Sequence, residues 1–185
     1  MFIQTEATPN PEVLKFLPGR AVTGAGTATF TAETGADRSP LAARLLAVAG
    51  VSEVFLAPDF VSVTKAPTTD WHGLKPAVLG AIMDHYQSGD PAMVGAQDGG
   101  AAESYDEDDA EIVIQIKELL ETRVRPAVAR DGGDIVFQGF DKGVVYLHMQ
   151  GACAGCPSST ATLKMGIEQL LRHYVPEVVE VRALN

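Results

Sequence analysis

The two cysteines of the chain, Cys153 and Cys156, lie in the stretch GACAGCPSST, separated by two small residues. Two thiols at this spacing can form a redox couple or supply half of a metal site. The surrounding sequence predicts that Cys153 leaves a strand and that Cys156 caps a helix beginning at Pro157. Unpaired N–H groups and the helix dipole favour a thiolate at such a position. The pattern therefore suits an activated thiolate pair, and it leaves redox chemistry and metal binding both open.

A dithiol/disulfide oxidoreductase is the alternative interpretation, because thioredoxin-like proteins share the order strand, CxxC, helix. That fold needs substantial further sheet after the motif helix, whereas about one helix and one strand follow Cys156. We therefore expect the cysteines to act as ligands, with the oxidoreductase as runner-up. A structural disulfide between them is not expected either, because no export signal is visible and cytosolic thiols stay reduced.

Metal binding requires more ligands than one chain offers, since a structural zinc or an iron–sulfur cluster usually takes four. His148 precedes the loop, and we interpret it as a half-exposed sheet residue rather than a third ligand. Two chains related by a two-fold axis would together place four thiolates around one shared site. The cysteine count thus predicts a metal-bridged homodimer, with small external thiols as the other source of ligands.

Composition and charge exclude several classes of protein. The formal net charge is -10, which argues against nucleic acid as a main partner, because phosphate binding needs clustered Lys and Arg. No apolar run approaches the roughly twenty residues that cross a bilayer. The N-terminal MFIQTEATPN lacks the basic and apolar regions of a signal peptide. We expect no membrane segment and a cytoplasmic location.

An acidic segment divides the sequence. Residues 91–110 carry six acidic side chains and no basic one, and the whole stretch 88–111 is rich in Gly, Ala and Ser. Such a segment buries too little surface to offset its ordering entropy, so we expect a flexible linker at 91–108. The prediction is a first domain at 1–90 and a second at 109–185.

The first domain is expected to combine a sheet with two helices. Extended segments are predicted at 2–11, 13–19 and 27–33, and a hairpin at 52–65. Ser39 and Pro40 open a helix that Gly50 ends. A last helix has Leu74, Val78 and Ile82 on one side, with Pro76 tolerable only in its first turn.

The second domain is expected to run helix, hairpin, CxxC loop, helix, strand. An amphipathic helix at 111–124 precedes strands at 134–140 and 143–150, which flank a tight DKG turn. A helix follows from Pro157 to about Tyr174, and Pro176 separates it from a closing strand at 177–183. The fold class is therefore α+β: two small domains on a flexible acidic linker, the second with helices on one face of its sheet.

The second half of the sequence strongly resembles the NifU-like C-terminal domain of Nfu-type iron–sulfur cluster proteins. The matching pieces are the DGGD turn at 131–134, the GACAGCPSS loop, the TLK and GIE stretches and the closing PEV. The first half resembles the N-terminal domain of the same family, through MFIQTEATPNPEVLKFLPG and WHGLKPAVLGAIMDHYQSG. The glycines of DGGD are expected to let the backbone approach the cysteine loop.

The resemblance implies a carrier or scaffold, not an enzyme, with no catalytic residues. Cys153 and Cys156 map onto the thiolates that hold a [4Fe–4S] cluster between two subunits in that family. A [2Fe–2S] cluster and a zinc-bridged dimer satisfy the same cysteine count.

The implied partners are recipient iron–sulfur apoproteins and upstream cluster-assembly proteins. The implied assembly is a cluster-bridged homodimer that is a monomer when empty, and the first domain is expected to recognise recipients. Mitochondrial relatives carry a transit peptide before this first strand. Its absence predicts the bacterial cytoplasm, or the mitochondrial matrix if a transit peptide has been removed.

Overall fold

The computed structural model describes residues 1–95, 103–154 and 157–184, with only the backbone at 157–159. The chain divides into two compact units, Met1–Gly99 and Gly100–Asn185. Each unit has its own sheet and its own cluster of buried apolar side chains. The centre of the expected linker, 96–102, lies outside the described residues.

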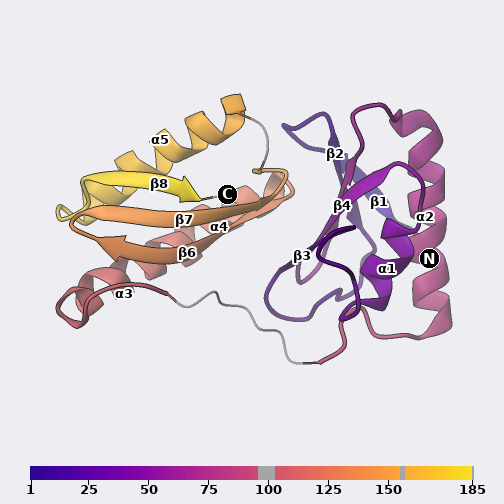
Figure 1. Ribbon diagram of the computed structural model, residues 1–185, viewed down its shortest axis with the longest axis horizontal. Helices are drawn as coiled ribbons and strands as arrows, with labels where there is room; N and C mark the ends of the chain where they lie inside the picture. Colours follow the sequence, from indigo (N-terminus) through magenta and orange to yellow (C-terminus); the bar gives the residue numbers. More distant parts are fainter. Residues whose placement is uncertain (96–102, 155–156, 185) are drawn as a thin grey trace. The chain divides into compact units, whose positions relative to one another are not determined.

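The first unit is built on a five-stranded antiparallel sheet of order β1-β2-β5-β4-β3 (Figure 1). The extended segments expected from the sequence all contain strands. Their bounds are Gln4–Ala7 (β1), Val13–Leu17 (β2), Ala28–Thr31 (β3), Val51–Leu56 (β4) and Val61–Lys65 (β5). The hairpin expected at 52–65 is therefore β4 and β5.

Two helices, α1 (Pro40–Leu46) and α2 (Trp71–Ser88), pack on one face of this sheet. The Ser39 hydroxyl accepts from the Ala42 N–H at 3.0 Å, as the expected cap requires. The expectation that Pro76 lies in a first turn is wrong, because α2 already begins at Trp71 with Asp70 as its cap. Pro76 is tolerated in the second turn because it and His72, whose carbonyl loses a donor, are both exposed to water.

The second unit begins with a helix longer than the sequence pattern predicted. Helix α3 (Ala110–Leu119) continues through a π-helical segment (Leu120–Val124) into α4 (Arg125–Arg130). Pro126 cannot donate a backbone hydrogen bond to the preceding turn, and the wider π turn precedes it. The buried positions form one continuous stripe: Val113, Ile116, Leu120, Val124 and Val128.

The sheet of the second unit has the order β6-β7-β8. Strands β6 (Gly133–Asp141) and β7 (Val144–Gly151) form the expected hairpin. Its turn places Lys142 and Gly143 at φ of 48° and 84°, the positive values of a type I′ turn. Helix α5 (Pro157–Tyr174) leads to β8 (Glu180–Leu184), which pairs with β7 in parallel. The predicted α+β class is confirmed.

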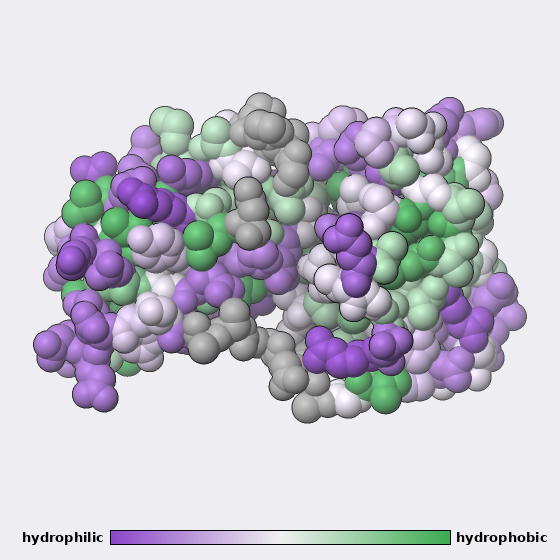
Figure 2. Space-filling view, in the orientation of Figure 1, coloured by the Kyte–Doolittle hydropathy of each residue, from purple (hydrophilic) through white to green (hydrophobic). Residues whose placement is uncertain are grey.

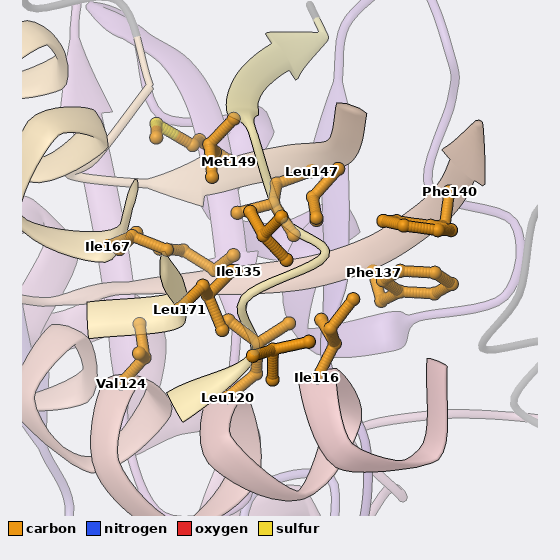
Figure 3. Close-up of a cluster of buried hydrophobic side chains, with 14 of the residues drawn as sticks. Ile116, Leu120, Val124, Ile135, Phe137, Phe140, Leu147, Met149, Ile167 and Leu171 are labelled. Atoms are coloured by element: carbon orange, nitrogen blue, oxygen red, sulfur yellow. The ribbon is translucent and has the colours of Figure 1, made fainter. Parts of the chain in front are cut away.

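The core of the second unit lies between the helices and one face of the sheet (Figure 3). Side chains from α3, the π-helical segment, β6, β7 and α5 converge there, including Ile116, Leu120, Ile135, Leu147 and Leu171. The surface of this unit is mixed, with hydrophilic side chains around scattered apolar ones on the face drawn in Figure 2.

Candidate functional site

Cys153 follows the end of β7 and is held through its backbone. The Ala152 N–H donates to the Gly132 carbonyl at 3.2 Å, and the Ala154 N–H donates to the Gly151 carbonyl at 3.0 Å. The Thr160 hydroxyl, from the first turns of α5, donates to the carbonyl of Cys153 itself at 3.0 Å. The strand and the helix therefore fix the backbone at Cys153 from both sides. Cys156 lies outside the described residues.

The side chain of Cys153 belongs to the core although its backbone is in a loop. The residue is 8% exposed and packs in the same apolar cluster as Ile135, Met149 and Ile167. The sequence placed Cys153 in a loop after a strand and gave no indication that its side chain is buried in the core. The alternation of β7 explains the difference, because Val145, Leu147 and Met149 point into the core and the chain turns back over it after Gly151.

Gly133, at the start of β6, lies directly against the sulfur of Cys153. A Cβ atom at this position would lie 2.6 Å from Sγ of Cys153 and 2.8 Å from the backbone oxygen of Gln150. No side chain fits at such distances, so the glycine permits the contact. The glycines of DGGD were expected to let the backbone approach the cysteine loop, and Gly133 does so.

A half-buried ion pair lies next to Gly133. Nε and Nη2 of Arg125 donate to the two carboxylate oxygens of Asp134 at 2.8 and 2.9 Å, and Arg125 also pairs with Glu121. The Asp134 side chain is 6% exposed, and the two-pronged contact raises the pKa of Arg125. Asp134 is next to Gly133, so the pair holds the start of β6 beside the sulfur.

Sequence reasoning missed the role of Arg125. A buried aspartate needs a partner, but the π-helical segment that precedes Arg125 shifts the phase of the helix. A regular helical pattern therefore gave no signal that this arginine faces β6.

The environment of Cys153 favours the neutral thiol in the empty chain. Burial, with the negative charges of Asp131 and Asp134, raises the pKa of the Cys153 thiol to about 12. The expectation of an activated thiolate is therefore wrong for Cys153. Disulfide exchange needs a free thiolate as the attacking group, whereas a metal ion deprotonates a thiol on binding it. The site suits a ligand better than a redox nucleophile.

The other candidate ligand considered, His148, does not face Cys153. It is half-buried on the side of β7 opposite to the core cluster in which Cys153 packs. Within 1–95, 103–154 and 157–184, no group of three or more His, Cys, Asp or Glu side chains is arranged to hold a metal ion. The described part of one chain thus gathers no such group of three around Cys153.

Comparison with known proteins covers both units. Residues 116–182 match the NifU-like domain, and residues 3–89 match the domain described as "Scaffold protein Nfu/NifU N terminal". The human "NFU1 iron-sulfur cluster scaffold homolog, mitochondrial" is 49% identical over 179 residues, 96% of this chain and 70% of that protein. "NifU-like protein 4, mitochondrial" of Arabidopsis thaliana is 52% identical over 181 residues, and the match covers 64% of its length.

Among solved structures, the NMR structure of a NifU-like protein from Saccharomyces cerevisiae has a TM-score of 0.47 and 22% sequence identity. The match covers 52% of this chain and 87% of the yeast chain. No helix in the described ranges is long and apolar enough to cross a membrane.

The two matched domains, each with an α+β fold, define the class of NifU-like scaffold proteins. The chain belongs to the Nfu family of that class. Several of its relatives, the human protein among them, are named as iron–sulfur cluster scaffold homologs.

Proposed function

We propose that this protein carries an iron–sulfur cluster as cargo, bound between two copies of the chain and passed on to recipient apoproteins. Cys153 and Cys156 of each copy supply the four thiolates, and the cluster is of the [4Fe–4S] type. Upstream cluster-assembly proteins load the carrier. The names of the relatives support the general role, since they are called iron–sulfur cluster scaffolds.

The observation that carries the proposal is the packing of Cys153. Its backbone is fixed by β7 and by Thr160, and its sulfur rests against the bare backbone of Gly133. A ligand sulfur held in this way is preorganised for a metal, while the chain offers only two cysteines. In this proposal a second copy, related by a two-fold axis, supplies the other two of the four thiolates.

Anaerobic reconstitution with iron and sulfide tests this proposal. One shared four-iron cluster predicts about two irons and two sulfides per chain, with a dimeric mass and the Mössbauer spectrum of a [4Fe–4S] centre. Four irons on a monomer, or uptake of zinc without iron, would contradict the shared cluster. About one iron per chain in a dimer would instead indicate a [2Fe–2S] cargo.

We propose further that the chain has a first domain at 1–90 and a second at 109–185. The first domain recognises recipients. It contains no cysteine, and its exposed apolar side chains include Phe2 and Met1 beside the edge strand β1. The second unit has its own core and contains Cys153. A tethered recognition module raises the effective concentration of the recipient near the cluster.

Deletion of residues 1–90 tests the role of the first unit. The truncated chain should assemble the cluster normally and transfer it more slowly to at least one recipient apoprotein at equal cluster concentration. Equal transfer rates for several recipients would remove this role from the first unit.

The relatives compared above are named as mitochondrial proteins. We propose the bacterial cytoplasm for this chain, and cell fractionation of its source would decide.

A further inference from the structure

The outer edge of β6 is occupied by a short piece of the chain that precedes α3. The Ser104 N–H donates to the Gln138 carbonyl at 3.0 Å, and the Phe140 N–H donates to the Ser104 carbonyl at 2.9 Å. Ser104 thus pairs in parallel with Gly139. We call residues 103–105 the edge segment.

Gly139 is shaped to receive the edge segment. A Cβ atom on Gly139 would lie 2.6 Å from the carbonyl oxygen of Ser104, so any side chain here would push the segment away. The ladder between β6 and β7 also shifts register between Phe137 and Gly139. An irregularity of this kind commonly ends or redirects pairing at a sheet edge.

Two side chains anchor the edge segment on either side of Ser104. The carboxylate of Glu103 pairs with Nζ of Lys117 in α3 at 2.7 Å. The ring of Tyr105 lies against that of Phe137, with 6.5 Å between their centroids. The segment is therefore docked on the second unit, although the sequence gives it the acidic composition of a linker.

The opposite edge of the same sheet also has a partner for its backbone. The Val181 N–H of β8 donates to the Glu168 carboxylate of α5 at 3.2 Å. Beside it, Glu180 and Arg182 form an exposed ion pair at 3.1 Å. Charged side chains and covered N–H groups are the usual means by which edge strands are kept from pairing with other chains.

We propose that the edge segment is an internal strand that closes β6 against pairing with β6 of a second copy. Identical edges pair readily across a two-fold axis, and a carrier that dimerises through its cysteines must bring copies of itself together. The need to bring two copies together rests on the proposed function. Closure of β6 leaves the cysteine end as the place where two copies meet.

Replacing Ser104 with proline opens the edge without touching the core. Ser104→Pro removes the N–H that donates to the Gln138 carbonyl. Because Ser104 is exposed, the variant should still fold. Ser104→Ala is the matched control, because it keeps that N–H. The experiment uses the full-length chain without cluster, so its outcome does not depend on the proposed cargo.

In the Ser104→Pro chain, exchange of the Phe140 amide hydrogen should be about tenfold faster than in Ser104→Ala at low concentration. Sedimentation velocity should show concentration-dependent dimers of the proline variant and monomers of the control. Gly139→Ala should behave like Ser104→Pro, since its methyl group displaces the Ser104 carbonyl. Adding Gln138→Lys to Ser104→Pro should abolish the dimers, because a lysine on an edge opposes pairing.

Equal exchange of the Phe140 amide in Ser104→Pro and Ser104→Ala would overturn the closure of β6. A proline variant that opens at Phe140 but sediments like the control would overturn the protective role. Dimers that persist when Gln138→Lys is added would show that the copies do not pair through β6, and would also overturn the protective role.

Discussion

Gly133 and Cys153 are in contact because Gly133 has no side chain. Its missing Cβ would lie 2.6 Å from Sγ of Cys153, inside any normal contact distance. The backbone oxygen of Gln150 closes the same space at 2.8 Å, so a side chain could not turn aside. The position of the Cys153 sulfur is thus set by the backbone of β6 as well as by its own loop.

The first prediction follows from this contact. Gly133→Ala should force the cysteine loop and β6 apart, at a cost of about 1–3 kcal/mol in the free energy of unfolding, and iron bound after reconstitution should fall. Gly166→Ala is the control, because its methyl group meets nothing within 4 Å and it lies in α5. Iron content at the wild-type level in Gly133→Ala would show that the contact does not matter for binding.

The second prediction separates ligation from packing at Cys153. Both Cys153→Ser and Cys153→Ala should lose the cluster. The serine variant should also be less stable than the alanine variant, by about 1–2 kcal/mol, because it buries a hydroxyl in an apolar cluster. Urea unfolding followed by NMR intensities of β7 amides measures the difference. Equal stability of the two variants would mean that the hydroxyl finds a hydrogen-bond partner there.

The third prediction concerns the ion pair between Arg125 and Asp134 at the start of β6. Arg125→Ala leaves the buried carboxylate of Asp134 without its two-pronged partner and should cost about 2–3 kcal/mol of stability. Arg125→Lys should recover only part of the loss, since an ammonium group cannot form the parallel pair of bonds. Arg182→Ala, in an exposed pair with Glu180, is the control and should leave the stability nearly unchanged. Urea unfolding of β6 and cluster retention are the measurements, and full rescue by lysine would contradict the geometric argument.

The fourth prediction is an acid sensitivity of the first unit. His85 is fully buried in α2, and neither ring nitrogen has a hydrogen-bond partner in the described part of the chain. Burial, reinforced by Arg44 and opposed by Asp90, lowers the pKa of His85 below its ordinary value of 6.5. The unfolded chain therefore binds the proton more readily than the folded unit does.

Stability of the first unit should consequently be full above about pH 6.5 and should fall as the pH drops toward the folded-state pKa of His85. His85→Leu should remove this part of the pH dependence, whereas His72→Leu, on the exposed side of the same helix, should keep it. The single tryptophan, Trp71, lies in this unit, so its fluorescence reports the unfolding there. Equal acid sensitivity of the wild-type and His85→Leu chains would contradict the assignment.

Local signals in the sequence predicted most of the fold. The helical spacing of Ile167 and Leu171, the turn formed by Lys142 and Gly143, and the cap at Ser39 each depend on neighbouring residues alone. The long-range features were not predictable in this way. The parallel pairing of β8 with β7 depends on how α5 crosses the sheet, and no spacing rule encodes it.

The site shows the same division between local and distant information. The ligand assignment of the CxxC motif, which remains a proposal for both cysteines, came from sequence alone. The burial of Cys153 and its contact with Gly133 arise where β6 and β7 are brought together. The pairing of Arg125 with Asp134 depends in addition on the phase of a π turn. These contacts between distant residues decide the protonation and stability of the site.

The parallel pairing of β8 has a consequence for the order of folding. The β6–β7 hairpin joins neighbours in the sequence, whereas β7 and β8 pair across the cysteine loop and α5. Closing the longer loop costs more entropy, so we expect the hairpin to form early and β8 to dock late. Cys153 shares its core cluster with Val181 of β8. We therefore expect a newly made chain to pass through a stage in which this thiol is open to oxidants and stray metal ions, before β8 shields it.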